Sequence, residues 1–164
     1  EHVMPAIWKR FPTAEFWMIG SNPPASIQAL ECDSRVHVTG FVENVCELLG
    51  AMSAVLCPWS GRYGFRSRVV EILAAGPPLV VFEDAIAGMD LSATDGIGIV
   101  GNLRDMASET LDLLCDAEQA QERSRRARSR CESLYDLSNT YDRLIHELHD
   151  WVSSRTHETR RLFA

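Results

Sequence analysis

The sequence predicts an α/β fold in which helices flank a parallel β-sheet. Short apolar runs that end at glycine or proline alternate with segments of helical spacing. The clearest unit spans residues 53–82 and reads strand, glycine loop, helix, strand. Parallel neighbours in a sheet need a crossover connection, which is usually a helix, so this unit predicts parallel strands.

The other elements follow from the same patterns in chain order. A helix is expected over residues 3–11, ended by Pro12, and a buried strand over residues 14–19, ended by Gly20. The patterns then predict a short helix at 25–30, a strand at 35–39, a helix ending at Gly50, strands at 53–57, 79–82 and 96–100, and helices at 103–114, 118–134 and 138–155.

The loop that leads into the helix beginning at Ser67 is the expected working part of the chain. The first turn of a helix offers free N–H groups and the positive end of its dipole, and Arg66 and Arg68 lie beside it. These features predict an anion site. Glu71, about one turn further along, would repel a phosphate but could accept hydrogen bonds from sugar hydroxyls, which is the layout that a nucleotide requires.

Residues 63–71, Y-G-F-R-S-R-V-V-E, followed by I-L-A-A-G-P-P-L-V-V, carry a specific resemblance. They resemble the signature of the group 1 (family 4) glycosyltransferases of GT-B fold, whose usual form is E-G-F-G-x-x-x-x-E-A-M-A-x-G-x-P-V-V. The resemblance implies a Rossmann-like parallel sheet with flanking helices, the C-terminal half of a GT-B fold. That half binds the nucleotide-sugar donor.

The resemblance also implies which residues bind the donor. Glu71 matches the glutamate that binds the ribose, and the glycine turn faces the diphosphate and sugar. The segment V-H-V-T-G-F-V matches the junction near the base. The full candidate set is Gly40, Phe41, Val42, Tyr63, Gly64, Phe65, Arg66, Ser67, Arg68 and Glu71. Tyr63 stands where the family has its first glutamate, and no catalytic residue is assigned.

The resemblance further implies that two parts of the family's structure are not in this sequence. The family's first strand, which is central in the sheet, has no match, so a gap is expected between the strands at 14–19 and 53–57. Either rearrangement closes this gap or another chain fills it, and an oligomer through the incomplete sheet is one form of the second alternative. The acceptor is expected on an N-terminal domain of the same protein.

The implied activity is retaining transfer of a hexosyl group from a nucleotide diphosphate sugar, and this chain by itself should bind the donor without turnover. No metal or cofactor is expected, because no D-x-D sequence occurs and GT-B enzymes generally need no metal. Two alternatives remain open. The chain could be a non-catalytic Rossmann-like interaction module, or half of a GT-B sugar-nucleotide epimerase.

Composition sets further bounds. The 164 residues favour one domain over residues 1–155, followed by a mobile polar tail at 156–164. A net charge of −7 argues against a nucleic-acid platform, and the arginine run at 123–130 is interpreted as a solvated helix face. His146 and His149 are interpreted as surface residues. Five cysteines without C-x-x-C spacing favour reduced thiols and the cytoplasm, with at most a peripheral membrane association.

Overall fold

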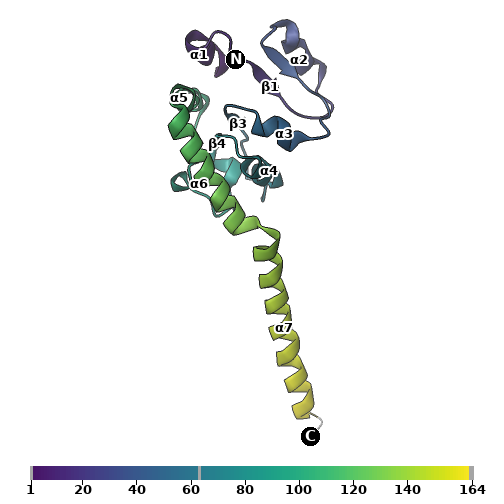
Figure 1. The fold of residues 1–164 in the computed structure, drawn as a ribbon. Coiled ribbons are helices and arrows are strands. Elements are labelled where there is room, and N and C mark those ends of the chain that lie inside the picture. The colour runs from purple at the N-terminus through teal and green to yellow at the C-terminus, as the bar shows by residue number, and fades with distance from the viewer. Residues whose placement is uncertain (1, 63, 163–164) are drawn as a thin grey trace.

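The computed structural model describes residues 2–62 and 64–162 and shows an α/β body from which one long helix leaves (Figure 1). The helices are α1 (Met4–Arg10), α2 (Ala25–Gln28), α3 (Val45–Gly50), α4 (Ser67–Ala75), α5 (Leu103–Cys115), α6 (Ala117–Tyr135) and α7 (Leu137–Leu162). The strands are β1 (Phe16–Met18), β2 (Val36–Val38), β3 (Val55–Cys57), β4 (Leu79–Phe82) and β5 (Gly98–Val100). Short 3-10 helices occupy Ala29–Cys32, Glu83–Ile86 and Ala93–Asp95.

Every strand pair among the described residues is parallel, as predicted. β1 pairs with β2, with Phe16 opposite Val36, and β4 lies between β3 and β5. The described strands therefore form a two-stranded and a three-stranded sheet. β1 and β3, between which the sequence predicted a gap, belong to different sheets, and the predicted α/β class with flanking helices is confirmed.

Four strands are shorter than the sequence suggested. The runs at 14–19, 35–39, 53–57 and 96–100 pair only over the three residues each of β1, β2, β3 and β5. Among the described strands, β1 and β3 each pair on one side only. A strand extends only as far as its backbone is hydrogen-bonded to a neighbouring strand. The apolar runs are therefore longer than the strands that they contain.

The core lies on both faces of β4, the most deeply buried strand. Leu79 and Val81 pack in a cluster with side chains of α3, α4 and α6. Val80, between them, packs in a second cluster with Met106 and Leu113 of α5. Successive side chains of a strand point to opposite faces, so a continuous apolar run is required here. The result is helix, sheet, helix.

The central unit follows the prediction closely. Helix α4 begins at Ser67 and ends before Gly76, whose φ of 88° is left-handed. A glycine at this position ends a helix at little steric cost. The next strand, β4, has the predicted bounds, so the glycine loop is held between two buried elements.

The end predicted for the last helix was wrong. Helix α7 was expected to end at residue 155 but continues to Leu162, because its sequence contains no glycine or proline that would break it. It is separated from α6 by Asp136, which has extended backbone and whose carboxylate accepts hydrogen bonds from the Leu137 N–H (2.7 Å) and the Ser138 hydroxyl (2.6 Å). Figure 1 shows α7 pointing away from the body. The mobility of residues 156–164 stays a prediction.

Two further features bear on the setting of the protein. Within residues 2–62 and 64–162, no helix combines the length and the apolar character that crossing a membrane requires. All five cysteines are free; Cys57 and Cys131 are buried, and the other three are exposed.

Candidate functional site

The connection between β3 and α4, together with the first half of α4, contains most of the predicted donor-binding residues. Gly61 and Gly64 have φ values of 88° and 83°, in the region where a Cβ atom is strained. A Cβ at Gly64 would meet no atom within 4 Å, so the backbone conformation and not crowding requires glycine there. Tyr63 lies outside the described residues, and its role stays a prediction.

The first half of this loop is held by two charged side chains. The Gly61 N–H donates to Asp84 Oδ2 at 2.8 Å, and the Gly61 carbonyl accepts from the Arg66 guanidinium at 2.8 Å. Arg62 Nε lies 3.4 Å from Asp84 Oδ1. The hydrogen bond from Gly61 and then the bond from Arg62 hold the pKa of Asp84 below its ordinary value. Asp84 is therefore charged at neutral pH.

The N-terminus of α4 is open. Its N-cap residue is Arg66, and among the described residues no side-chain hydrogen bond caps this end of the helix. By contrast, Asn44, Asn102 and Asp116 cap α3, α5 and α6 with side-chain oxygens. The first turn of α4 thus keeps N–H groups for another acceptor, and Ser67 within it is exposed.

Arg68 and Glu71 lie one turn apart on the exposed side of α4. Their side chains are 59% and 46% exposed, and Arg68 Nε lies 4.0 Å from Glu71 Oε2. An exposed pair at this distance contributes about 0 to 1 kcal/mol, so a ligand can replace the contact at little cost. Both groups are therefore accessible beside the open first turn.

Two other predicted residues of the loop direct their side chains elsewhere. The Phe65 ring stands edge-on to Tyr135 of α6, with 5.4 Å between the ring centroids. The Arg66 guanidinium lies 5.4 Å from the centre of the Trp59 ring, in addition to its bond to Gly61. Arg66 therefore shapes the loop, whereas Arg68 on α4 keeps an exposed guanidinium.

The predicted base-binding residues lie at the carboxyl end of β2. Gly40 has a φ of 66° and forms an antiparallel bridge with Gly20, which joins the ends of β1 and β2. Phe41 is 81% exposed, while Val42 is half-buried. An aromatic ring as open as that of Phe41 can stack against a flat heterocycle.

Core packing connects the two predicted loops. Ile19, at the end of β1, packs against the same apolar cluster as Val45, which follows the Gly40 loop. Trp59, which precedes Gly61, packs against that cluster too. Since the strands within each sheet are parallel, each loop leaves the carboxyl edge of its own sheet. The shared apolar cluster thus links the two sets of predicted residues.

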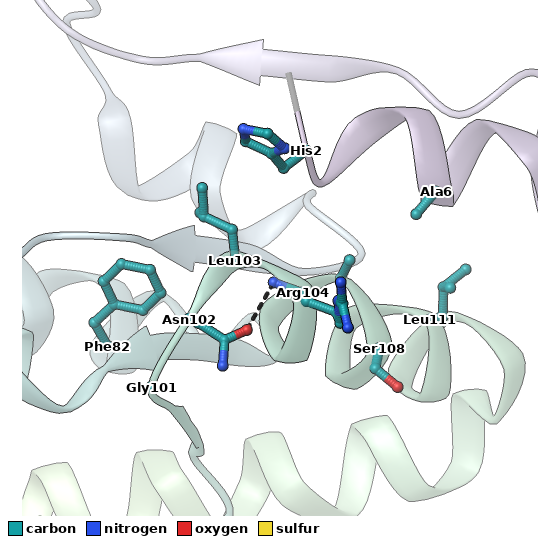
Figure 2. Close-up of a pocket in the computed structure, with 10 residues that line it drawn as sticks. His2, Ala6, Phe82, Gly101, Asn102, Leu103, Arg104, Ser108 and Leu111 are labelled. Atoms are coloured by element: carbon teal, nitrogen blue, oxygen red, sulfur yellow. Dashed lines mark hydrogen bonds between the residues drawn. The ribbon is translucent and has the colours of Figure 1, made fainter.

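A separate hollow of about 730 Å³ lies between α1 and the start of α5 (Figure 2). Figure 2 shows Asn102 accepting the backbone N–H of Arg104, a hydrogen bond of 2.9 Å that caps α5. The hollow is lined by His2, Ala6, Phe82, Gly101, Asn102, Leu103, Arg104, Ala107, Ser108 and Leu111. None of these is a predicted donor-binding residue, so the candidate site is an open edge of the sheet and not this hollow.

The arginine run on α6 makes contacts within the chain. Arg123 donates to Glu109, and Arg130 lies 2.6 Å from the Asp90 carboxylate. Arg125 and Arg128 pair with glutamates on their own helix. These contacts favour the interpretation of the run as a helix face. Among the described residues, no group of three or more His, Cys, Asp or Glu side chains is placed to hold a metal ion.

Sequence reasoning missed Asp84 and Arg62. Asp84 follows β4 closely, and the carboxyl ends of neighbouring parallel strands meet at one edge of a sheet. That rule would have brought Asp84 to the loop after β3. Glu83 is also acidic and also follows β4 directly, so the sequence does not distinguish the two residues. Only the structure identifies which carboxylate contacts Gly61.

Known structures share this architecture. Anabaena Alr3699/HepE in complex with UDP superimposes with a TM-score of 0.77 at 15% identity, over 90% of this chain and 44% of HepE. HepE in complex with UDP-glucose gives a TM-score of 0.74 at 15% identity, over 90% and 44%. TarM gives 0.69 at 16% identity, over 88% and 30%. This chain therefore spans less than half of HepE and less than a third of TarM.

Sequence comparison adds the family. No curated protein matches the chain. Residues 1–117, however, match the family described as "Glycosyl transferases group 1", which covers both predicted loops, α4 and the parallel strands. The open N-terminus of α4 and the glycine turn before it lie within this match. The chain belongs to the group 1 glycosyltransferases and has the fold of one half of a GT-B enzyme.

Proposed function

We propose that this chain is the donor-binding half of a retaining glycosyltransferase that uses a nucleotide diphosphate sugar. The turn from Gly64 to Arg68 holds the diphosphate, and Glu71 binds the ribose hydroxyls. Gly40, Phe41 and Val42 hold the base, mainly through backbone. A hexose is the proposed transferred group. Tyr63, which stands where the family has its first glutamate, is the residue proposed to lie beside that hexose.

One observation carries this proposal: the first turn of α4 is uncapped, and Arg68 and Glu71 are exposed beside it. Free N–H groups and a guanidinium favour a diphosphate, whereas a carboxylate one turn away favours hydroxyls. A ligand that combines both groups at this spacing is a nucleoside diphosphate.

During transfer, negative charge develops on the departing diphosphate. The first-turn N–H groups of α4 and the Arg68 guanidinium would stabilise that charge more strongly than they stabilise the bound donor, which lowers the barrier. This chain contributes leaving-group stabilisation and donor orientation. Transfer also needs an acceptor, which is proposed to lie on an N-terminal domain of the same protein.

Helix α7 supports the proposal of a second domain. Between Leu137 and Val152 its large apolar side chains are exposed, including Leu144, Leu148 and Trp151. An apolar stripe of this width is typical of a helix that packs against a folded surface. Five free cysteines favour a reducing compartment, so the cytoplasm is the proposed location.

Isothermal titration of the purified chain with UDP, GDP, ADP and TDP tests the proposal. UDP is the first probe, because HepE was solved with UDP and UDP-glucose. Saturable binding of one nucleotide is expected. Arg68→Ala should weaken it about tenfold or more, since a hydrogen bond to a charged group contributes about 1.5 to 3 kcal/mol. Glu71→Ala should weaken nucleotide binding but not binding of the free diphosphate.

The chain supplies matched controls for both substitutions. Arg125 and Glu122 form the same kind of exposed pair, three residues apart, on α6. Arg125→Ala and Glu122→Ala should leave nucleotide affinity unchanged. Equal losses in the α4 and α6 variants, or binding of none of the four nucleotides, would contradict the donor site and favour the interaction-module alternative.

A further inference from the structure

Asp84 connects the glycine loop to the body of the protein. It belongs to the 3-10 helix Glu83–Ile86, in which Ala85 and Ile86 are buried, so its backbone is held by the core. Its two carboxylate oxygens face the loop after β3: Oδ2 accepts the Gly61 N–H at 2.8 Å, and Oδ1 lies 3.4 Å from Arg62 Nε. The carboxylate thus joins a fixed element to a loop that contains two left-handed glycines.

The contact continues through Gly61 to the start of α4. The Gly61 carbonyl accepts from Arg66 at 2.8 Å, so both polar groups of this residue are held by side chains. Arg66 is the N-cap residue of α4, and its guanidinium also lies over Trp59. Asp84, Gly61 and Arg66 therefore form one connected chain from the end of β4 to the first turn of α4.

We propose that Asp84 is a positioning residue for the donor diphosphate, an inference that rests on the donor-binding function proposed above. Asp84 does not itself contact the ligand. By fixing Gly61, and through it Arg66, it holds the turn from Gly64 to Ser67 in the conformation that presents the α4 N–H groups. A loop that is ordered before binding loses less entropy when the ligand arrives, and the saving appears as affinity.

The negative charge of Asp84 could oppose diphosphate binding. An anionic carboxylate near the diphosphate would repel it, and removing that charge would then tighten binding. Asp84 is paired with Arg62, faces Arg66 and accepts the Gly61 N–H, and these partners lower its pKa. Because the charge is compensated on the side that faces the loop, loop ordering is expected to outweigh repulsion.

The experiment combines amide hydrogen exchange with titration by UDP and by uridine, followed by NMR. In Asp84→Ala, exchange at Gly61 should accelerate and the Kd for UDP should rise about tenfold, the size expected for loss of a charge-assisted hydrogen bond that orders a loop. Uridine lacks the diphosphate, so its Kd should not change. Asp84→Asn keeps one acceptor oxygen and should fall between wild type and Asp84→Ala.

Asp33→Asn is the matched control. Asp33 also pairs with an arginine and accepts a backbone N–H, both from Arg35, but it lies at the opposite end of β2 from Gly40. This variant should lose stability and keep the wild-type Kd for both ligands. A general loss of structure would weaken UDP and uridine alike, so the ratio of the two Kd values separates positioning from stability.

Three outcomes would overturn the inference: an unchanged Kd for UDP in Asp84→Ala, a tighter one, or equal weakening of UDP and uridine. A tighter Kd would mean that the carboxylate competes with the diphosphate. These outcomes presuppose that the wild-type chain binds UDP. If the wild type binds no nucleoside diphosphate, the donor-binding function fails together with this inference. Should Asp84→Ala fail to fold, Asp84→Asn gives the same comparison.

Discussion

Helices α5 and α7 have similar amphipathic sequences but opposite surroundings. On α5, Met106 and Leu113 of the apolar face are buried in a cluster with Val80 of β4. On α7, Leu148 and its apolar neighbours are exposed, and the helix points away from the body (Figure 1). The comparison teaches that helical spacing identifies an apolar face but not what covers it.

The path of the chain explains the difference. Helix α5 follows β5 after Gly101 and Asn102 and folds back across the sheet, so its face meets the side chains of β4. Helix α7 starts after the break at Asp136, beyond the last strand. Burial of an apolar face drives packing only where another apolar surface is within reach. Three substitutions test how far this contrast extends.

The largest effect is expected for Leu113→Ala on α5. Leu113 is 2% exposed, and truncating a buried leucine to alanine costs about 2 to 5 kcal/mol through lost transfer energy and the cavity that remains. Urea unfolding followed by circular dichroism measures the loss. A change below about 1 kcal/mol would mean that α5 is no better packed than α7.

A smaller effect is expected for Gly96→Ala, which tests how α6 docks before the chain reaches α7. Gly96 has a φ of 91°, and a Cβ there would overlap the backbone oxygen of Arg123. Backbone strain and overpacking together should cost about 2 to 4 kcal/mol of unfolding free energy. Gly88→Ala is the control, because its φ is 82° but no atom lies within 4 Å. Equal losses in both would show that the α6 contact contributes nothing.

The smallest effect is expected for Leu148→Ala on α7. Leu148 is 52% exposed, so truncation should change the stability of this chain by no more than about 0.5 kcal/mol. In a polypeptide that also contains the proposed N-terminal domain, the same substitution should cost substantially more, because that domain would cover the helix. The same small effect in both proteins would contradict the proposal that α7 packs against a second domain.

Local patterns predicted the elements of the body well. The run of Leu79 to Phe82 predicted β4, and Gly76 before two prolines marked the end of α4, because these signals depend on backbone preferences of single residues. The separation of β1 and β3 into different sheets was expected from the family pattern. The end of α7 was misplaced because polarity does not stop a helix, whereas glycine or proline does.

The candidate site also contains features that the sequence predicted and features that only the structure shows. The glycine turn and the exposed Arg68 and Glu71 were readable from residues 63–71, because the helix period places them on one side of α4. The direction of Arg66 toward Gly61, and of Phe65 toward Tyr135, was not readable. Both depend on groups that lie elsewhere along the chain and reach the loop only after packing.

The sequence by itself determined the parallel α/β class, the order of the elements, the glycine turn and the family, since each follows from local spacing and residue type. Only the tertiary structure decided that Asp84, and not Glu83, holds Gly61, and that the face of α7 stays open. Both outcomes depend on contacts between residues distant in sequence. The contact of Asp84 with Gly61 forms because the sheet brings the ends of β3 and β4 together. The face of α7 is uncovered because the helix leads away from the sheet.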